Sequence, residues 1–132
     1  MGPSEAIAAA FVTAVRSIGL ICYQVVPQAA DGGSGAVYPH VQIGAIVFTE
    51  WDTKTETGID FTVRLHTRWR GASTVIGRQI QDELFTALHG AVLEMDGATC
   101  LEVRRETSTI IDLPDGGFDG VCEYRGQMEL NA

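Results

Sequence analysis

Residues 59–69 read IDFTVRLHTRW, and this stretch decides the fold of the chain. Apolar side chains stand at alternate positions from Ile59 to Leu65 and return at Trp69, with polar or charged side chains between them. A period of two predicts a strand with one buried face and one solvent-exposed face.

Residues 41–48 read VQIGAIVF and predict a second strand that pairs with the first. The alternation is looser there, because two apolar residues interrupt the more polar face. The predicted buried face holds Val41, Ile43, Ala45 and Val47, and the interruptions are Ile46 and Phe48. A polar tip at Thr49–Gly58 is expected to join the two strands into a long hairpin.

Two stretches have the period of an amphipathic helix. The first runs from Ser4, the expected N-cap, to Ile18, and Gly19 ends it. The second opens near Ser73 and stops at Gly90. The residues expected on the buried faces are Ile7, Phe11, Val15 and Ile18 in the first helix and Ile76, Ile80, Leu84 and Leu88 in the second.

Three further strands complete the predicted sheet. Leu20–Val26 is apolar and short, whereas Thr99–Ile111 is long and loses its alternation near Arg105, where we expect a bulge. After a turn at Leu113–Gly117, the closing strand is expected at Phe118–Leu130.

The order of these elements predicts the α+β class. We expect a mainly antiparallel or mixed sheet with two α-helices packed on one face and a projecting β-hairpin. A length of 132 residues suits one domain, so residues 1–132 are interpreted as a single unit.

The chain is acidic, with a net charge of −8 from 9 basic and 17 acidic residues. Nucleic-acid binders use Lys and Arg to displace counterions from phosphates, so general affinity for DNA or RNA is not expected. No apolar run reaches the ~18 residues of a membrane span, so no membrane partner is expected. The N-terminal segment lacks the basic start of a secretory signal, and we expect folding in the cytoplasm.

The sequence provides no convincing set of metal ligands, so we expect no metal and no cofactor. Three cysteines without a CxxC spacing are best explained as small buried hydrophobes: Cys22, Cys100 and Cys122. Three histidines fall on different predicted elements, at spacings that match no metal motif: His40, His66 and His89.

A hydrolase is the chemical alternative, because carboxylates crowd the hairpin near a histidine. These residues are Glu50, Asp52, Glu56, Asp60 and His66. The chain has no Gly-x-Ser-x-Gly motif, and carboxylate-rich tips are usually solvated turns. We therefore expect no catalytic residue.

Several short motifs occur in a familiar order along the chain. They are Tyr38-Pro39-His40-Val41-Gln42-Ile43-Gly44, Trp51-Asp52-Thr53-Lys54 with Gly58, Leu65-His66-Thr67-Arg68 with Arg70-Gly71, Leu88-His89-Gly90, Asp96-Gly97, Asp112 with Asp115-Gly116, and Tyr124-Arg125-Gly126. Taken together, the sequence resembles the tail-terminator, or tail-completion, family of long-tailed phages and gene transfer agents. The loop at Asp31–Gly35 and the residues between Pro114 and Gly120 depart from the family pattern.

The resemblance implies a structural virion protein without enzymatic activity. Members of the family form a six-membered ring that caps the finished tail tube, stops its polymerisation and meets the head connector, while DNA passes through the lumen. The implied partners are therefore further copies of the chain, the tail tube protein and the connector or stopper protein. The implied location is the head–tail junction of a virion.

Two groups of residues are candidates for the interfaces of such a ring. One is the hairpin tip, where Trp51, Asp52 and Lys54 would dock on a neighbouring subunit or on the tube. The alternative for this tip is that Trp51 folds back onto its own sheet.

The second group is a basic strand face that would meet carboxylates of a partner: Arg64, His66, Arg68 and Arg70. Its alternative is cross-strand pairing with the domain's own acidic residues. DNA contact within the ring is a third reading. The loop Asp31–Gly35 and the turn Pro114–Gly117 are weaker candidates for contacts along the ring axis.

Two other functions stay open at this point. One is another neck protein, such as a head-completion stopper or a minor tube component. The other is a small α+β domain that binds a ligand or catalyses a reaction, which a deep pocket with polar lining would favour.

Overall fold

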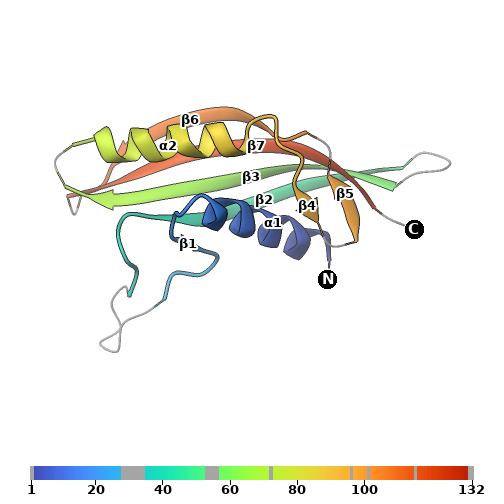
Figure 1. Ribbon diagram of the computed structural model, residues 1–132, viewed down its shortest axis with the longest axis horizontal. Helices are drawn as coiled ribbons and strands as arrows, with labels where there is room; N and C mark the ends of the chain where they lie inside the picture. Colours follow the sequence, from blue (N-terminus) through green and yellow to red (C-terminus); the bar gives the residue numbers. More distant parts are fainter. Residues whose placement is uncertain are drawn as a thin grey trace.

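The computed structural model describes residues 2–27, 35–52, 57–71, 73–95, 97–100, 102–114 and 116–130, with the backbone alone at positions 51, 52, 57 and 130. Within these residues, two helices cover one face of a seven-stranded sheet (Figure 1). The elements are α1 (Pro3–Ser17), β1 (Cys22–Tyr23), β2 (His40–Asp52), β3 (Thr57–Arg70), α2 (Val75–Leu88), β4 (Glu94–Met95), β5 (Ala98–Cys100), β6 (Arg104–Asp112) and β7 (Gly117–Leu130). The predicted α+β class is confirmed.

Four long strands form the centre of the sheet and alternate in direction. β3 pairs antiparallel with β2 on one side and with β7 on the other, and β7 pairs antiparallel with β6. Short strands extend the sheet at both sides: β1 runs parallel to the start of β2, and β5, followed by β4, pairs with the end of β7. The sheet is therefore mixed and mainly antiparallel, as the sequence predicted.

The strict alternation of β3 places one of its faces in the core, which confirms the interpretation of residues 59–69. The residues at most 2% exposed on this face are Ile59, Phe61, Val63, Leu65, Thr67 and Trp69. Phe11 of α1 packs edge to face against Phe61, with ring centroids 6.2 Å apart. Each large apolar side chain buried here stabilises the fold by roughly 1.5–3 kcal/mol.

A bulge in β2 corrects the predicted faces of that strand. Ile43 lies opposite Leu65 and Ile46 lies opposite Val63, so β2 has one residue more than β3 between these pairs. The extra residue reverses the alternation. Val41 and Ile43 are buried as predicted, whereas Ala45 and Val47 are exposed, and Ile46 packs against the core in their place.

The hairpin strands are longer than predicted. β2 continues to Asp52 and β3 begins at Thr57, so the expected tip at Thr49–Gly58 is strand except for residues 53–56, which lie outside the described residues. β7 explains the extension, because it pairs with β3 as far as Gly58, which lies opposite Glu129. The end of the hairpin is thus continuous with the rest of the sheet through β7.

Both helices begin differently from the prediction. The N-cap of α1 is Gly2 with Pro3 as the first helical residue, so Ser4 is not the cap. Proline favours this first position because its fixed φ suits the helix and its missing N–H has no intrahelical partner there. Ile18 is exposed because it follows the last turn of α1, and Ile76 is exposed because Gly77, not Ile76, faces the sheet in the first turn of α2.

Two of the predicted strands are shorter in the structure. Of Leu20–Val26, only Cys22–Tyr23 pairs with β2. Thr99–Ile111 divides into β5 and β6 because the backbone of Val103 turns away from β7: its N–H donates to Ala91 O, and its C=O accepts from Gly90 N–H. The bulge expected near Arg105 is confirmed by a register shift between Arg105 and Thr107.

Candidate functional site

We call the face of the sheet opposite the helices the helix-free face. It carries a row of polar and charged side chains, which we call the ladder. Alternation explains it, because the residues of β3 and β7 that point away from the core are mostly polar. The ladder consists of Gln42 on β2, Asp60, Arg64, His66 and Arg68 on β3, Glu106 on β6, and Asp119, Glu123 and Arg125 on β7.

Arg64 and Glu123 form the most regular pair of the ladder. They lie directly opposite each other on β3 and β7, and Arg64 Nη2 donates to Glu123 Oε1 at 2.9 Å. The side chains are 46% and 29% exposed, so solvent screens the pair, and such pairs stabilise by only about 0.2–1 kcal/mol. Arg64 therefore remains accessible to a partner.

Asp119 is the centre of the more buried part of the ladder. Its carboxylate lies 3.1 Å from His66 Nδ1 and 4.0 Å from Arg68 Nε, and Arg68 Nη1 also donates to Gln42 Oε1. The His66 ring lies directly over Gly44 in the β2 bulge, where an added Cβ would stand 2.7 Å from the ring. The bulge thus supplies the space that this histidine occupies.

Arg125 holds two carboxylates at the other half of the face. Its guanidinium lies 3.9 Å from Asp60 Oδ2 and 3.6 Å from Glu106 Oε1. Together with Val47 and Thr49 of β2, these side chains line a hollow of about 270 Å³. Hydrogen-bond donors and acceptors are present there, but the arginine neutralises much of the charge of the two carboxylates.

A cluster of aromatic residues lies next to the ladder, beside β1. His40 is 2% exposed and lies between Tyr23 and Tyr38, with ring centroids 5.2 and 5.0 Å away, and its Nδ1 donates to Val37 O at 3.0 Å. Burial, and secondarily the nearby Arg68 guanidinium, lower the pKa of His40, so the ring is neutral at pH 7. The Arg70 guanidinium stacks 4.7 Å above the Tyr38 ring.

The structure brings three of the predicted interface residues together. Arg64, His66 and Arg68 lie along one face of β3, and each contacts an acidic residue of the same domain, which is the cross-strand alternative considered from the sequence. Arg70 belongs instead to the aromatic cluster around Tyr38.

The remaining predicted residues lie at the end of the hairpin. The backbones of Trp51 and Asp52 form the last two residues of β2, opposite Gly58 and Thr57. Lys54 and Glu56 lie outside the described residues, as does most of the loop Asp31–Gly35. Three residues of the ladder were not predicted as site residues, although the alternation of residues 118–128 places them on one face: Asp119, Glu123 and Arg125.

The described residues offer little for catalysis or metal binding. Among them, no group of three or more His, Cys, Asp and Glu side chains could hold a metal ion. The His89 ring has a structural role instead of a metal-binding one, because its Nδ1 accepts a hydrogen bond from the Arg105 N–H and the ring stacks on Phe85. Of the described helices, none is long and apolar enough to cross a membrane.

The three cysteines are buried and their thiols are weakly reactive. Burial raises the pKa of the Cys22 thiol to about 11 and also raises the pKa of Cys100 and Cys122. A thiol is far less nucleophilic than a thiolate, so these groups behave as the small hydrophobes that the sequence predicted.

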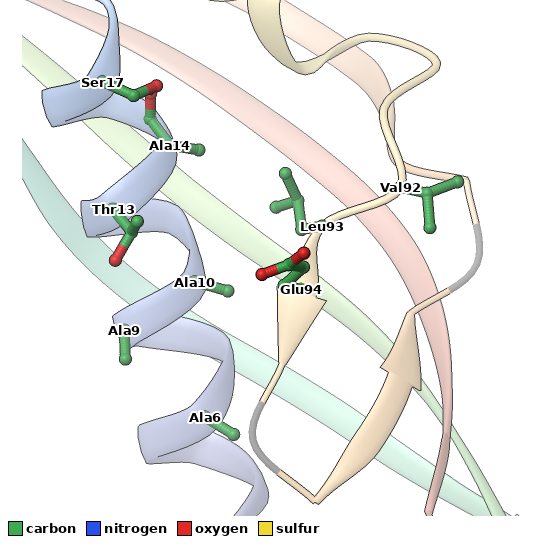
Figure 2. A pocket seen from close by; sticks show the side chains of 9 residues that line it. All are labelled: Ala6, Ala9, Ala10, Thr13, Ala14, Ser17, Val92, Leu93 and Glu94. Atoms are coloured by element: carbon green, nitrogen blue, oxygen red, sulfur yellow. The ribbon is translucent and has the colours of Figure 1, made fainter.

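A groove of about 410 Å³ lies between α1 and residues 92–94, at the start of β4 (Figure 2). Leu93 and Glu94 point toward the helix, whose lining side chains are mostly alanine methyls. Glu94 is the one carboxylate among the described residues that line it, and these residues supply no convergent pair of ionisable groups for acid–base chemistry. This lining does not favour the alternative of a ligand-binding or enzymatic domain.

The comparison with protein families decides the classification. The sequence matches the family model of the tail completion protein gp17 over residues 6–129. The chain belongs to this family. It is thus a structural virion protein of the phage-tail type.

A solved structure has the same fold. A chain in the virion of a native gene transfer agent particle superposes with a TM-score of 0.81 at 16% sequence identity, covering 96% of this chain and 96% of that chain. At this identity the likeness concerns the fold. No curated protein matches the sequence.

Proposed function

We propose that this tail completion protein forms a ring of six copies that caps the tail tube, stops its polymerisation and joins the tail to the head connector. The observation that supports the proposal is the family match, which extends over residues 6–129 and so includes nearly every element of the fold. A ring requires head-to-tail contacts in which each subunit uses two different surfaces.

The proposed contact surfaces are the hairpin end and the helix-free face. In the first group, Trp51, Asp52 and Lys54 would dock on a neighbouring subunit or on the tube. In the second, Arg64, His66, Arg68 and Arg70 would exchange or share their acidic partners with carboxylates of another chain. Arg64 is best suited to this, because its guanidinium has five donors and Glu123 engages one of them at hydrogen-bond distance.

DNA would pass through the lumen of this ring without sequence-specific contacts. Six copies with a net charge of −8 each carry about −48 charges, and an acidic assembly repels a polyanion. The proposed place of the ring is the head–tail junction, after assembly in the host cytoplasm.

Electron microscopy of particles that lack this protein tests the assignment. Overlong or uncapped tails support termination of the tube. Tails of normal length with empty necks would instead identify the protein as a stopper, and tails with a shortened or interrupted tube would identify it as a minor tube component.

The hairpin contact has its own test. Trp51→Ala should leave the monomer folded and lower the fraction of capped tails, whereas Trp51→Phe, which keeps an aromatic anchor, should restore capping. Circular dichroism of the purified monomer is the control. If Trp51→Ala unfolds the monomer, Trp51 belongs to the core and the assignment of the hairpin end as a docking site is wrong.

A further inference from the structure

Apart from the short strands β1 and β4 at its ends, the sheet has two long open edge segments. Among the described residues, β6 pairs only with β7, and β2 has a neighbour on its outer side only at Val41 and Gln42, which β1 covers. Figure 1 shows these two strands at opposite long edges of the sheet. An open strand presents a row of unpaired N–H and C=O groups, which readily pair with another strand.

The directions of the strands fit a ring. Because β2, β3, β7 and β6 alternate in direction, the two open edges run opposite to each other. Rotation about a ring axis preserves strand direction along that axis, so β6 of one copy can lie antiparallel to β2 of the next. We infer that the sheets of neighbouring subunits are joined through their main chains, with β6 of one copy paired to β2 of the next. This inference rests on the proposed ring.

Both open edge strands, β2 and β6, carry exposed apolar side chains on the segments that would pair. Val47 and Phe48 of β2 are 65% and 38% exposed, and Ile111 of β6 is 51% exposed beside the half-buried Ile110. An antiparallel register that places Ile111 opposite Val47 also places Ile110 opposite Phe48. Such cross-strand apolar pairs stabilise a sheet.

The faces of the two sheets agree in this register. Val47 and Ile111 lie opposite Thr62 and Asp119 on the helix-free face. Phe48 and Ile110 lie opposite Phe61 and Gly120 on the face that the helices cover. The helices of adjacent copies therefore remain on the same side of the joined sheet.

Alternate residues of β6 direct their main-chain N–H and C=O groups away from β7, toward the open edge. Leu113 N–H donates to Gly117 O at 2.8 Å at the turn between β6 and β7. Antiparallel pairs alternate between bonded and non-bonded, so Ser108, Ile110 and Asp112 direct their N–H and C=O groups away from β7. These groups are then available to β2 of the next copy.

A steric constraint supports the same orientation. β1 covers the start of β2, so the next copy must pair with Ile46–Asp52 and is shifted along the strand. A stagger of this kind is what closure of a sheet into a barrel requires.

A disulfide placed across the seam tests the register. In virion tails assembled with the double variant Val47→Cys and Ile111→Cys, the two cysteines should face each other at a Cα distance of about 4.5–5.5 Å, which a disulfide spans. Mild oxidation should produce covalent multimers up to the full ring on a non-reducing gel. The native cysteines are buried and should not compete.

Each single-cysteine variant is a control and should remain monomeric on the gel. A covalent dimer from Ile111→Cys alone would mean that two β6 strands pair about a two-fold axis, and a product containing tube protein would mean that the tube occupies this edge. Either result overturns the inference, as do rings seen by microscopy that the double variant fails to cross-link. Absence of any ring at the tail ends of the unmodified protein would refute the proposed function instead.

A proline in β6 tests the main-chain contact without a new bond. Ser108→Pro removes an N–H that points away from β7, a position where edge strands tolerate proline. The variant should fold as a monomer, while the share of subunits found in rings falls about tenfold or more. Ser108→Ala keeps the N–H and is the matched control. Normal ring yield with Ser108→Pro contradicts the inference, and the disulfide decides the question if this variant does not fold.

Discussion

Gly77 is the position where a single methyl group should do most damage to the fold. A Cβ built on Gly77 would lie 2.0 Å from Cη2 of Trp69 and 2.2 Å from its Cζ2, against an optimal carbon–carbon separation of about 3.5–4.0 Å. The indole cannot retreat easily, because it is buried, stacks on Phe118 with centroids 5.2 Å apart, and donates from Nε1 to Ser73 O at 3.0 Å.

Two effects of Gly77→Ala oppose each other. Alanine favours a helix interior over glycine by about 0.8–1.0 kcal/mol. Overpacking a tight core costs typically about 1–3 kcal/mol, and disturbing the Trp69–Ser73 bond costs about 1 kcal/mol more. We therefore expect a net loss of roughly 1–3 kcal/mol in the free energy of unfolding.

Urea denaturation followed by circular dichroism measures this change. The control is Gln79→Ala at an exposed position of the same helix, which should leave stability nearly unchanged. The double variant Gly77→Ala with Trp69→Phe should lose less than the sum of the two single variants, because the smaller ring frees the space. Unchanged or increased stability of Gly77→Ala would refute the close approach of α2 to Trp69.

Three further predictions concern the core and its ionisable groups. Leu84→Ala should lower the free energy of unfolding by about 2–5 kcal/mol in urea denaturation, because it opens a cavity under α2, whereas Glu83→Ala on the exposed side should change it little. Burial lowers the pKa of His40 below its ordinary value of 6.5. The free energy of unfolding should therefore be unaffected by His40 above that pH and should decrease as the pH falls below it, because the unfolded chain then binds the proton more readily than the folded chain. This decrease between pH 7 and 5 should be smaller in His40→Gln; equal slopes of thermal midpoint against pH would contradict the buried neutral ring. The three cysteines should react with a thiol reagent at neutral pH only after unfolding, and rapid labelling of the native protein would be inconsistent with their burial.

The elements with a strict period were predictable from the sequence. The alternation of residues 59–69 defined β3 and its buried face, and the repeat Ile80, Leu84, Leu88 defined the buried face of α2. In both cases one local pattern reports one environment, because every second or every fourth residue meets the same neighbour. The polarity of the helix-free face followed from the same rule.

Features that depend on a distant partner were not predictable. The β2 bulge exists in relation to β3, and the division of Thr99–Ile111 depends on bonds between Val103 and the chain after α2. The pairing of His66 with Asp119 joins positions 53 residues apart, and no local pattern indicates which carboxylate a histidine will meet. The resemblance to a family supplied the structural role, which composition and spacing alone did not.

The charge ladder also limits what the net charge of the chain can explain. Within the ladder, three arginines stand among four carboxylates, so the charges nearly cancel; these residues are Arg64, Arg68, Arg125, Asp60, Glu106, Asp119 and Glu123. Most of the net charge of −8 must therefore arise from other parts of the chain. A lumen wall made of the ladder would repel DNA only weakly, because paired charges cancel at distances beyond the Debye length of about 8 Å. The orientation of the sheet in the ring, rather than the composition of the subunit, then determines whether the channel is acidic.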